Sequence, residues 1–247
     1  MSASVRRVTL QFESEVLGIP TARLDLETAP NGAESLDDAV RREMATFKDA
    51  GLMLVTCRIP SADGAAAVLE ANGFRRIEEL VQLRQALPSG HRMPADIRFA
   101  TAEDRQYCIA IGREAFSFDR FHADPRITDE RADGLKARWV ANAFDGRADK
   151  IFVADRGHGA EGFLLCMRRG ATAVIDLIAV TSSSRGMGRG KALASAGLAY
   201  YSGLGASTMI VGTQAANLAS LAMYQTLGFA EEARFFTYHW MPKIGVD

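Results

Sequence analysis

The chain has 247 residues, a length that suits two modest α/β domains better than one. Hydrophobic residues make up 48% and charged residues 24%, which is ordinary for a soluble globular protein. The formal net charge of -1 excludes the strong basic field of a nucleic-acid-binding protein, and no apolar run is long enough to span a bilayer.

The start of the chain, residues 1–7, lacks the apolar core of a secretory signal. Cys57, Cys108 and Cys166 are odd in number and widely spaced, which is typical of reduced thiols rather than of a disulfide framework. The histidines show no ligand spacing with one another or with cysteine. We therefore expect a cytoplasmic protein without a metal, and without a nucleic-acid or membrane partner.

Two prolines and a glycine interrupt the periodic segments at residues 87–94, and this composition predicts a linker. The linker divides the chain into an N-terminal domain, 1–94, and a second domain, 95–247.

The two domains share a pattern of strand, helix, Gly-Phe and strand. In the first domain its members are residues 52–57, 65–71, Gly73-Phe74 and 80–87; in the second they are 208–213, 218–227, Gly228-Phe229 and 235–240. Glycine supplies the left-handed residue after a helix, and the aromatic side chain packs back on the last turn. We interpret the repetition as a degenerate internal duplication, with chance recurrence as the alternative. The first copy has no glycine-rich turn upstream and carries Leu69 where the second carries Tyr224.

The second domain opens with Thr101-Ala102-Glu103-Asp104, which resembles a capping box at a helix start. A polar loop over 116–128 and a second helix over 129–144 follow. Residues 151–154 and 162–167 predict a hairpin, and the apolar run 174–180 predicts a strand buried on both faces. The order helix, helix, three strands, glycine turn, helix, strand, helix, strand predicts a mixed-sheet α/β fold.

The glycine turn is Arg185-Gly186-Met187-Gly188-Arg189-Gly190, followed by Lys191, at a strand-to-helix junction. Glycines let consecutive N–H groups converge, and the helix N-terminus adds partial positive charge at the same point. Arg185, Arg189 and Lys191 add full charges, so the expected ligand is an anion of the pyrophosphate type. The spacing does not match the dinucleotide fingerprint, and Gly190-Lys191-Ala192 does not end a Walker loop. A purely structural turn is the remaining alternative.

This Arg-x-x-Gly-x-Gly turn after an apolar strand resembles the acetyl-CoA signature of the GNAT acetyltransferase superfamily. The resemblance covers residues 97–240. It implies a GNAT fold with a central mixed, largely antiparallel sheet, preceded here by a smaller degenerate GNAT-like α/β domain, and it implies acetyl-CoA as cosubstrate.

The resemblance also implies roles for residues around the turn. The amides of Arg185, Gly186, Met187, Gly188, Arg189, Gly190 and Lys191 would hold the pyrophosphate. The backbone of Ile178, Ala179 and Val180 would pair with the pantetheine arm, as an added strand does. The next strand would splay away at Ile210–Thr213 to admit the thioester. Asn217 matches a position that contacts the cofactor in the family, and its alternative role is that of a helix N-cap.

Amine acetylation requires a proton for the departing thiolate, and a tyrosine hydroxyl near the sulfur supplies one. In the family a tyrosine of the last helix, shortly before Gly-Phe, takes this role, and Tyr224 matches it; packing alone is the alternative. Asp176 lies where some members carry a catalytic glutamate. It is equally suited to pairing with an arginine, and ordered water is then the base.

Four further segments are similar to the TDP-fucosamine N-acetyltransferase family: residues 12–20, 117–122, 139–142 and 211–217. That family acetylates the amino group of a nucleotide-linked deoxyamino sugar. The resemblance implies such a sugar as the acceptor and allows a homodimer. Another small amine or a protein N-terminus as acceptor, or a non-catalytic acyl-CoA-binding module, are the alternative functions.

The acceptor is expected to meet the loop 116–128. Cationic side chains there suit a diphosphate, and aromatic rings suit a base or sugar face; a solvated charged lid is the alternative. The candidates are Phe118, Arg120, Phe121, His122, Asp176 and Thr213.

Overall fold

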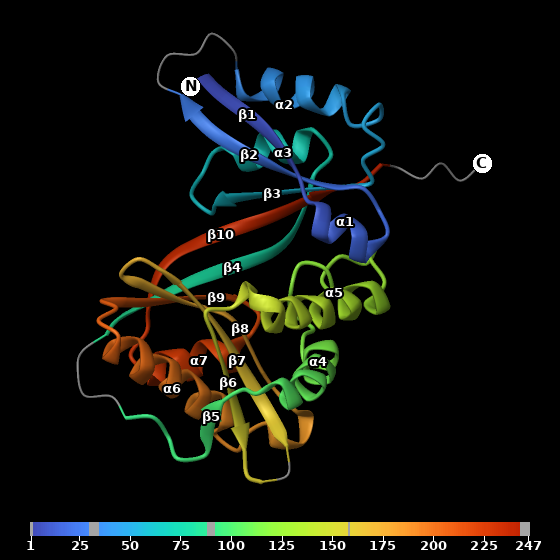
Figure 1. The fold of residues 1–247 in the computed structure, drawn as a ribbon. Coiled ribbons are helices and arrows are strands. Elements are labelled where there is room, and N and C mark those ends of the chain that lie inside the picture. Colours follow the sequence, from blue (N-terminus) through green and yellow to red (C-terminus); the bar gives the residue numbers. More distant parts are fainter. Residues whose placement is uncertain (1, 30–34, 88–91, 158, 243–247) are drawn as a thin grey trace. The chain divides into compact units, whose positions relative to one another are not determined.

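The computed structural model describes residues 2–29, 35–87, 92–157 and 159–242 (Figure 1). It divides into two compact units: unit 1 comprises Met1–Leu80 and Arg234–Asp247, and unit 2 comprises Val81–Ala233. This division groups residues by their spatial contacts and does not test the predicted domain boundary, so the domains 1–94 and 95–247 stay a prediction. None of the described helices is both long enough and apolar enough to cross a membrane.

Unit 1 alternates strands with helices. Its elements are β1 (Ser2–Thr9), α1 (Gln11–Leu17), β2 (Thr21–Ala29), α2 (Leu36–Ala45), β3 (Leu54–Pro60), α3 (Ala65–Ala71), the first residues of β4 (Arg75–Ala86) and the last residues of β10 (Ala230–Trp240). β1 and β2 are antiparallel, and β2 and β3 are parallel over Thr21–Leu24 and Leu54–Cys57. The core gathers Leu24, Val55, Leu69 and Phe74 among its buried side chains.

Unit 2 holds the longer sheet. Its elements are β5 (Ile97–Phe99), η1 (Ala102–Asp104), α4 (Arg105–Glu114), α5 (Asp129–Asn142), η2 (Ala143–Arg147), β6 (Lys150–Asp155), β7 (Ala160–Arg169), β8 (Thr172–Val180), η3 (Ser182–Ser184), α6 (Arg189–Gly203), β9 (Thr208–Gln214), α7 (Leu218–Thr226) and the start of β10 (Ala230–Trp240). β5 to β8 form an antiparallel meander, and β8 and β9 are parallel. The predicted hairpin and mixed-sheet α/β plan are confirmed.

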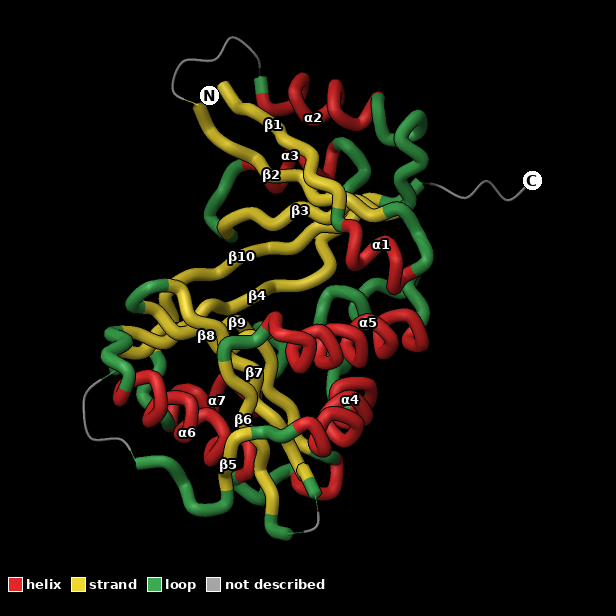
Figure 2. Tube along the Cα trace, viewed as in Figure 1, coloured by secondary structure: helices red, strands yellow, loops and turns green. Residues whose placement is uncertain are grey.

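Helices cover both faces of the unit 2 sheet, as Figure 2 shows with helices in red and strands in yellow. Leu164 and Cys166 of β7 pack with α6 and α7, whereas Phe163 and Leu165 pack with α4 and α5. This alternation follows from the period of two along a strand, and it explains why β7 is apolar throughout. β8 does not match the prediction of full burial, because its residues 176–178 are only partly buried.

The last strand of each half of the chain begins in one unit and ends in the other. β4 follows α3, and its residues Val81 and Leu83 are buried in the core of unit 2. β10 follows α7, and its residues Phe235–Trp240 pair antiparallel with β3 in unit 1. Local sequence patterns predict a strand but not its neighbour, so this crossing of strands between the units could not be predicted.

The predicted Gly-Phe helix ends are confirmed in both halves. Gly73 and Gly228 have φ of 80° and 89°. The N–H of Phe74 donates to the carbonyl of Leu69 at 3.0 Å, and the N–H of Phe229 donates to that of Tyr224 at 3.1 Å. These are matching Schellman closures, in which the residue after glycine bonds five positions back.

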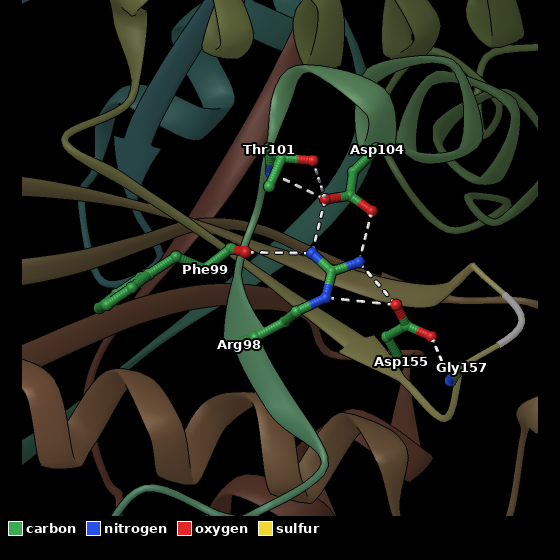
Figure 3. A network of polar contacts seen from close by, with 6 residues as sticks. All are labelled: Arg98, Phe99, Thr101, Asp104, Asp155 and Gly157. Carbon is green, nitrogen blue, oxygen red and sulfur yellow. Dashed lines mark hydrogen bonds and ion pairs between the residues drawn. The ribbon is translucent and has the colours of Figure 1, made fainter.

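An ionic network fixes the start of α4 (Figure 3). The Arg98 guanidinium donates to both carboxylate oxygens of Asp104, at 2.7 and 2.9 Å, and to Asp155 at 2.6 Å. Asp104 also accepts the N–H of Thr101, which completes the predicted capping box. The bonds from Arg98 lower the pKa values of Asp104 and Asp155, so both carboxylates stay charged and hold α4 against the β6–β7 hairpin.

Candidate active site

The glycine turn lies between β8 and α6, and its backbone suits an anion. Gly186 and Gly188 have φ of 75° and 77°, a region that favours glycine. The first intrahelical bond runs from the Ala192 N–H to the Gly188 carbonyl, so the N–H groups of residues 189–191 precede any intrahelical acceptor. A Cβ built on either glycine meets no atom within 4 Å, so the space above the turn is open. The turn therefore fits a pyrophosphate group.

The three cations of the turn are not equivalent. Arg185 and Lys191 are exposed, and Arg185 reaches the carbonyl of Ala115 at 3.4 Å. Arg189 is only 4% exposed and pairs with Asp96 at 2.6 Å and with Glu161 at 3.0 Å. The expected contribution of the Arg189 side chain to anion binding is therefore wrong, because two carboxylates already neutralise it. Its backbone N–H remains one of the three at the helix start.

β8 and β9 separate beside the turn. Their pairing runs from Thr172↔Thr208 to Ile175↔Val211 and stops there. Within the described residues, the β8 edge of residues 177–180 has no strand partner on this side. The predicted splay at Ile210–Thr213 is thus corrected, since Ile210 and Val211 still pair and the opening starts two positions later, at Gly212. The edge includes the predicted pantetheine contacts Ile178, Ala179 and Val180, and it offers backbone groups to an extended ligand.

Asp176 sits at the start of this opening. The register between β7 and β8 shifts there, from Leu165↔Leu177 to Cys166↔Ile175, which leaves Asp176 as an extra residue in a bulge. Its carboxylate accepts the Trp139 Nε1–H at 3.0 Å and two bonds from Arg147 at 2.7 and 3.0 Å. The sequence left open whether Asp176 is a catalytic base or pairs with an arginine, and in the structure it pairs with Arg147.

Tyr224 lies on α7, which covers the α6 side of the sheet. The side chain is 1% exposed and belongs to the same apolar cluster as Ile178 and Val180. Its ring meets that of Phe229 edge-on, with centroids 5.3 Å apart. Burial raises the pKa of the phenol, so the hydroxyl keeps its proton at neutral pH. A protonated phenol beside the free edge can act as an acid; this role stays a prediction.

Asn217 and Thr213 lie between β9 and α7. The Asn217 side chain accepts the N–H of Ser220 at 3.1 Å, which is the N-cap role given as the alternative. The cofactor contact of Asn217 and the substrate contact of the buried Thr213 stay predictions.

The loop 116–128 is held by internal ion pairs. His122 lies between Asp119, 2.6 Å from its Nδ1, and Asp133, 3.1 Å from its Nε2. Burial alone would lower the pKa of His122, but its bonds to Asp119 and Asp133 raise it. Burial would likewise raise the pKa of Asp119, yet His122 and Lys136 lower it to about 2. The loop is therefore an ordered element, and His122 is already paired with carboxylates.

The aromatic residues of this loop differ in exposure. Phe118 is 46% exposed, whereas Phe121 is 2% exposed and has the Arg120 guanidinium 4.5 Å from its ring centre. The predicted stacking of Phe121 on a ligand is wrong, because its ring is in the core. Stacking of Phe118 on a ligand and contact of Arg120 with the acceptor stay predictions.

A pocket of about 340 Å³ lies beside the turn, between α4 and the end of β8. Apolar side chains of α4 form one wall, and Thr181, Ser182 and Arg185 form another. Tyr107 and Glu114 also line it, and sequence reasoning missed both. The helical pattern of α4 marks its buried side only, so no signal in the sequence could have indicated them.

The free strand edge and the anion turn lie side by side between the two helix layers, an arrangement that suits a ligand with a pyrophosphate and an extended arm. Residues 113–229 match the model of the Acetyltransferase (GNAT) family, so this part of the chain is similar to a GNAT acetyltransferase domain, and its mixed α/β sheet is that of the GNAT fold.

The chain is also similar to individual curated proteins and solved structures. It is 24% identical over 189 residues to the spore coat polysaccharide biosynthesis protein SpsD of Bacillus subtilis (strain 168), covering 75% of this chain and 65% of that protein. It is 28% identical over 178 residues to the mycothiol acetyltransferase of Renibacterium salmoninarum, covering 64% and 49%. The solved structure of a GCN5-related N-acetyltransferase from Sphaerobacter thermophilus matches with a TM-score of 0.71 and 17% identity, over 100% of this chain and 78% of that one. The chain thus spans 65% and 49% of the length of these two curated relatives, and the structural likeness shows the fold.

Proposed function

We propose that the protein is an acetyl-CoA-dependent N-acetyltransferase. The observation that carries this proposal is the open anion turn, with Gly186 and Gly188 at positive φ, next to the unpaired edge of β8. Either feature alone has a structural explanation. Their adjacency suits a ligand that joins a pyrophosphate to an extended amide-bearing arm.

In the proposed mechanism the N–H groups of residues 189–191 and the helix dipole bind the pyrophosphate, with charge from Arg185 and Lys191. The edge of residues 177–180 aligns the arm by backbone hydrogen bonds. Acetyl-CoA supplies the activated acetyl thioester. The Tyr224 hydroxyl then donates its proton to the departing thiolate sulfur. Burial raises the pKa of this hydroxyl, so it is protonated at neutral pH before the transfer.

We propose a nucleotide-linked deoxyamino sugar as the acceptor. The support is the resemblance to the TDP-fucosamine N-acetyltransferase family and the similarity to SpsD, whose name concerns polysaccharide biosynthesis. Similarity to mycothiol acetyltransferases favours a second candidate, another small amine. A protein N-terminus and a non-catalytic acyl-CoA-binding module remain weaker alternatives. A cytoplasmic location and a homodimer belong to the same proposal.

We also propose that the N-terminal domain is a degenerate copy of the GNAT domain. Strand β2 reads TARLDLETA and β8 reads TAVIDLIAV, with Thr, Ala, Asp and Leu at matching places. Both strands pair in parallel with the next strand over their first four residues only. The first turn of α2 carries Asp37 and Asp38, whose negative charges repel a phosphate. The copy would therefore serve as scaffold.

The decisive experiment measures acetyl-CoA binding by calorimetry and thiol release with a panel of acceptors. The panel includes TDP- and UDP-amino sugars, simple polyamines and peptides. Sugar-nucleotide-dependent release supports the proposed acceptor, and release with another amine supports the second candidate. Binding without any release indicates a non-catalytic module, and no heat with acetyl-CoA refutes the proposal.

A further inference from the structure

The bulge at Asp176 distinguishes the two copies of the strand. In unit 1, β1 and β2 pair without interruption from Ser2↔Ala29 to Thr9↔Ala22. In unit 2, β7 and β8 pair on both sides of Asp176 but leave that residue without a partner in β7. The copy with the anion turn therefore has the bulge, and the copy without the turn has a regular ladder.

The equivalent aspartates have different surroundings. Asp25 lies opposite Arg6 in the regular ladder and bonds to Arg6 and Arg23, both on strands. Asp176 bonds instead to Trp139 on α5 and to Arg147 on η2. We call Trp139, Arg147 and Asp176 the bulge clamp. The clamp connects the extra residue of the strand to the helix layer that covers it.

The three side chains of the clamp fix one another through hydrogen bonds and a cation–π contact. Asp176 Oδ2 accepts from both Trp139 and Arg147, and Oδ1 accepts from Arg147. The Trp139 ring has the Arg147 guanidinium 4.8 Å from its centre and the Lys136 ammonium 5.3 Å away. Charge-assisted and bidentate bonds of this kind are about twice as strong as neutral ones. The Asp176 side chain is 14% exposed and that of Arg147 is 34% exposed, so solvent screens the ion pair in part.

A bulge bends its strand and increases the local twist. The residues that follow Asp176 are those of the free edge, and the pairing with β9 ends one residue before it. The extra residue thus stands between the paired part of β8 and the part that turns away from β9.

We propose that the bulge clamp is a positioning device that sets the direction of the free edge, residues 177–180, for the pantetheine arm. This inference rests on the proposed function. Asp176 acts through the strand and not as the proton acceptor, since an aspartate paired with arginines also stands at the same place in the copy that lacks the turn. Trp139 and Arg147 are positioning residues; sequence reasoning placed Trp139 only in a family-like segment and did not name Arg147.

The test uses three variants of the full chain: Trp139→Phe, Arg147→Met and Asp176→Asn. Arg105→Met is the matched control, because it removes an exposed pair between α4 and Asp145 of η2 that does not reach the strand. CoA affinity is measured by calorimetry, and hydrogen exchange reports CoA-dependent protection of amides 177–180 and 189–191. Circular dichroism confirms folding of each protein.

We expect each clamp variant to weaken CoA binding by about 10- to 100-fold, the cost of a hydrogen bond to a charged group. Protection of amides 177–180 should be lost while that of amides 189–191 persists at saturating CoA. Arg105→Met should bind CoA as the wild type does. Unchanged affinity and protection in the clamp variants refute the inference, as does loss of kcat in Asp176→Asn alone with normal CoA affinity, which indicates a base. Absence of CoA binding by the wild type refutes the proposed function instead.

A variant that fails to fold is replaced by its conservative partner. Arg147→Lys keeps the charge but not the bidentate geometry, and we expect CoA affinity between that of the wild type and that of Arg147→Met. Affinity equal to the wild type for Arg147→Lys would mean that charge alone suffices, and the positioning role would be wrong.

Discussion

Tyr224 and Phe229 are joined at the end of α7 by a backbone hydrogen bond and by a contact between their rings. The N–H of Phe229 donates to the carbonyl of Tyr224 at 3.1 Å, and their rings meet edge-on with centroids 5.3 Å apart. The backbone bond recurs between Leu69 and Phe74 at the end of α3. The same closure thus holds an apolar residue in one half and a phenol in the other, so the closure itself does not require the hydroxyl.

The Tyr224→Phe variant should therefore fold normally and lose turnover. We expect kcat to fall about 10²-fold, because the departing thiolate loses its positioned acid. Acetyl-CoA affinity should change little, since the ring keeps its packing. Thiol-release kinetics and calorimetry measure the two quantities, and turnover equal to the wild type would remove Tyr224 from the mechanism.

The Gly188→Val variant should abolish CoA binding. The φ of 77° disfavours any side chain, and a β-branched one would also project into the open space above the turn. Gly170→Val is the matched control, because Gly170 has a φ of 61° and equally open space in the β7–β8 turn. Both variants should lose stability by a similar amount in thermal unfolding, but only Gly188→Val should lose CoA heat. Retained affinity would mean that the turn does not hold the pyrophosphate.

Substitution of Arg189 should lower the stability of the fold, whereas substitution of Lys191 should lower the affinity for CoA. Arg189→Met breaks ion pairs to Asp96 and Glu161 from a buried guanidinium, and we expect a loss of about 2–4 kcal/mol in the free energy of unfolding. Lys191→Met should leave that free energy within about 0.5 kcal/mol of the wild type. Its CoA affinity should instead fall a few-fold, and the difference should shrink as salt increases. A stability loss from Lys191→Met as large as that from Arg189→Met would contradict the assignment.

The His122–Asp119 pair should contribute to stability over a defined range of pH. The pKa of Asp119 is lowered from 3.8 to about 2, so its contribution is present above pH 3.8 and is lost as pH falls toward 2. The pKa of His122 is raised from 6.5, so its contribution is present below pH 6.5 and is lost as pH rises through the higher folded-state value. The unfolding temperature of His122→Gln should differ most from that of the wild type between about pH 4 and 6.5. A difference that grows above pH 7 would contradict this sign.

Local chemistry explains what the sequence predicted well. The capping box of Thr101 and Asp104, the Gly-Phe ends at Gly73 and Gly228, and the turn around Gly188 each depend on residues a few positions apart. Their conformations follow from side-chain bonding and from φ values that glycine favours, so reading the sequence was sufficient.

The predictions that failed depend on distant partners. Arg189 meets Asp96 across 93 positions, and no local pattern indicates that this cation is neutralised. Phe121 was expected at a ligand because its loop is polar, yet its own ring is buried. The bulge at Asp176 is a relation between two strands, so β8 read alone looked like a regular apolar strand.

The exchange of β4 and β10 has a consequence for how the protein can be divided. A fragment that starts after residue 94 would lack Val81 and Leu83, and so would leave a hole in its own hydrophobic interior. A fragment that ends there would leave the β3 edge that pairs with Phe235–Trp240 unprotected and prone to aggregation. We therefore expect that neither piece would fold by itself, so the proposed scaffold domain could not be removed at the predicted linker without unfolding the proposed acetyltransferase domain.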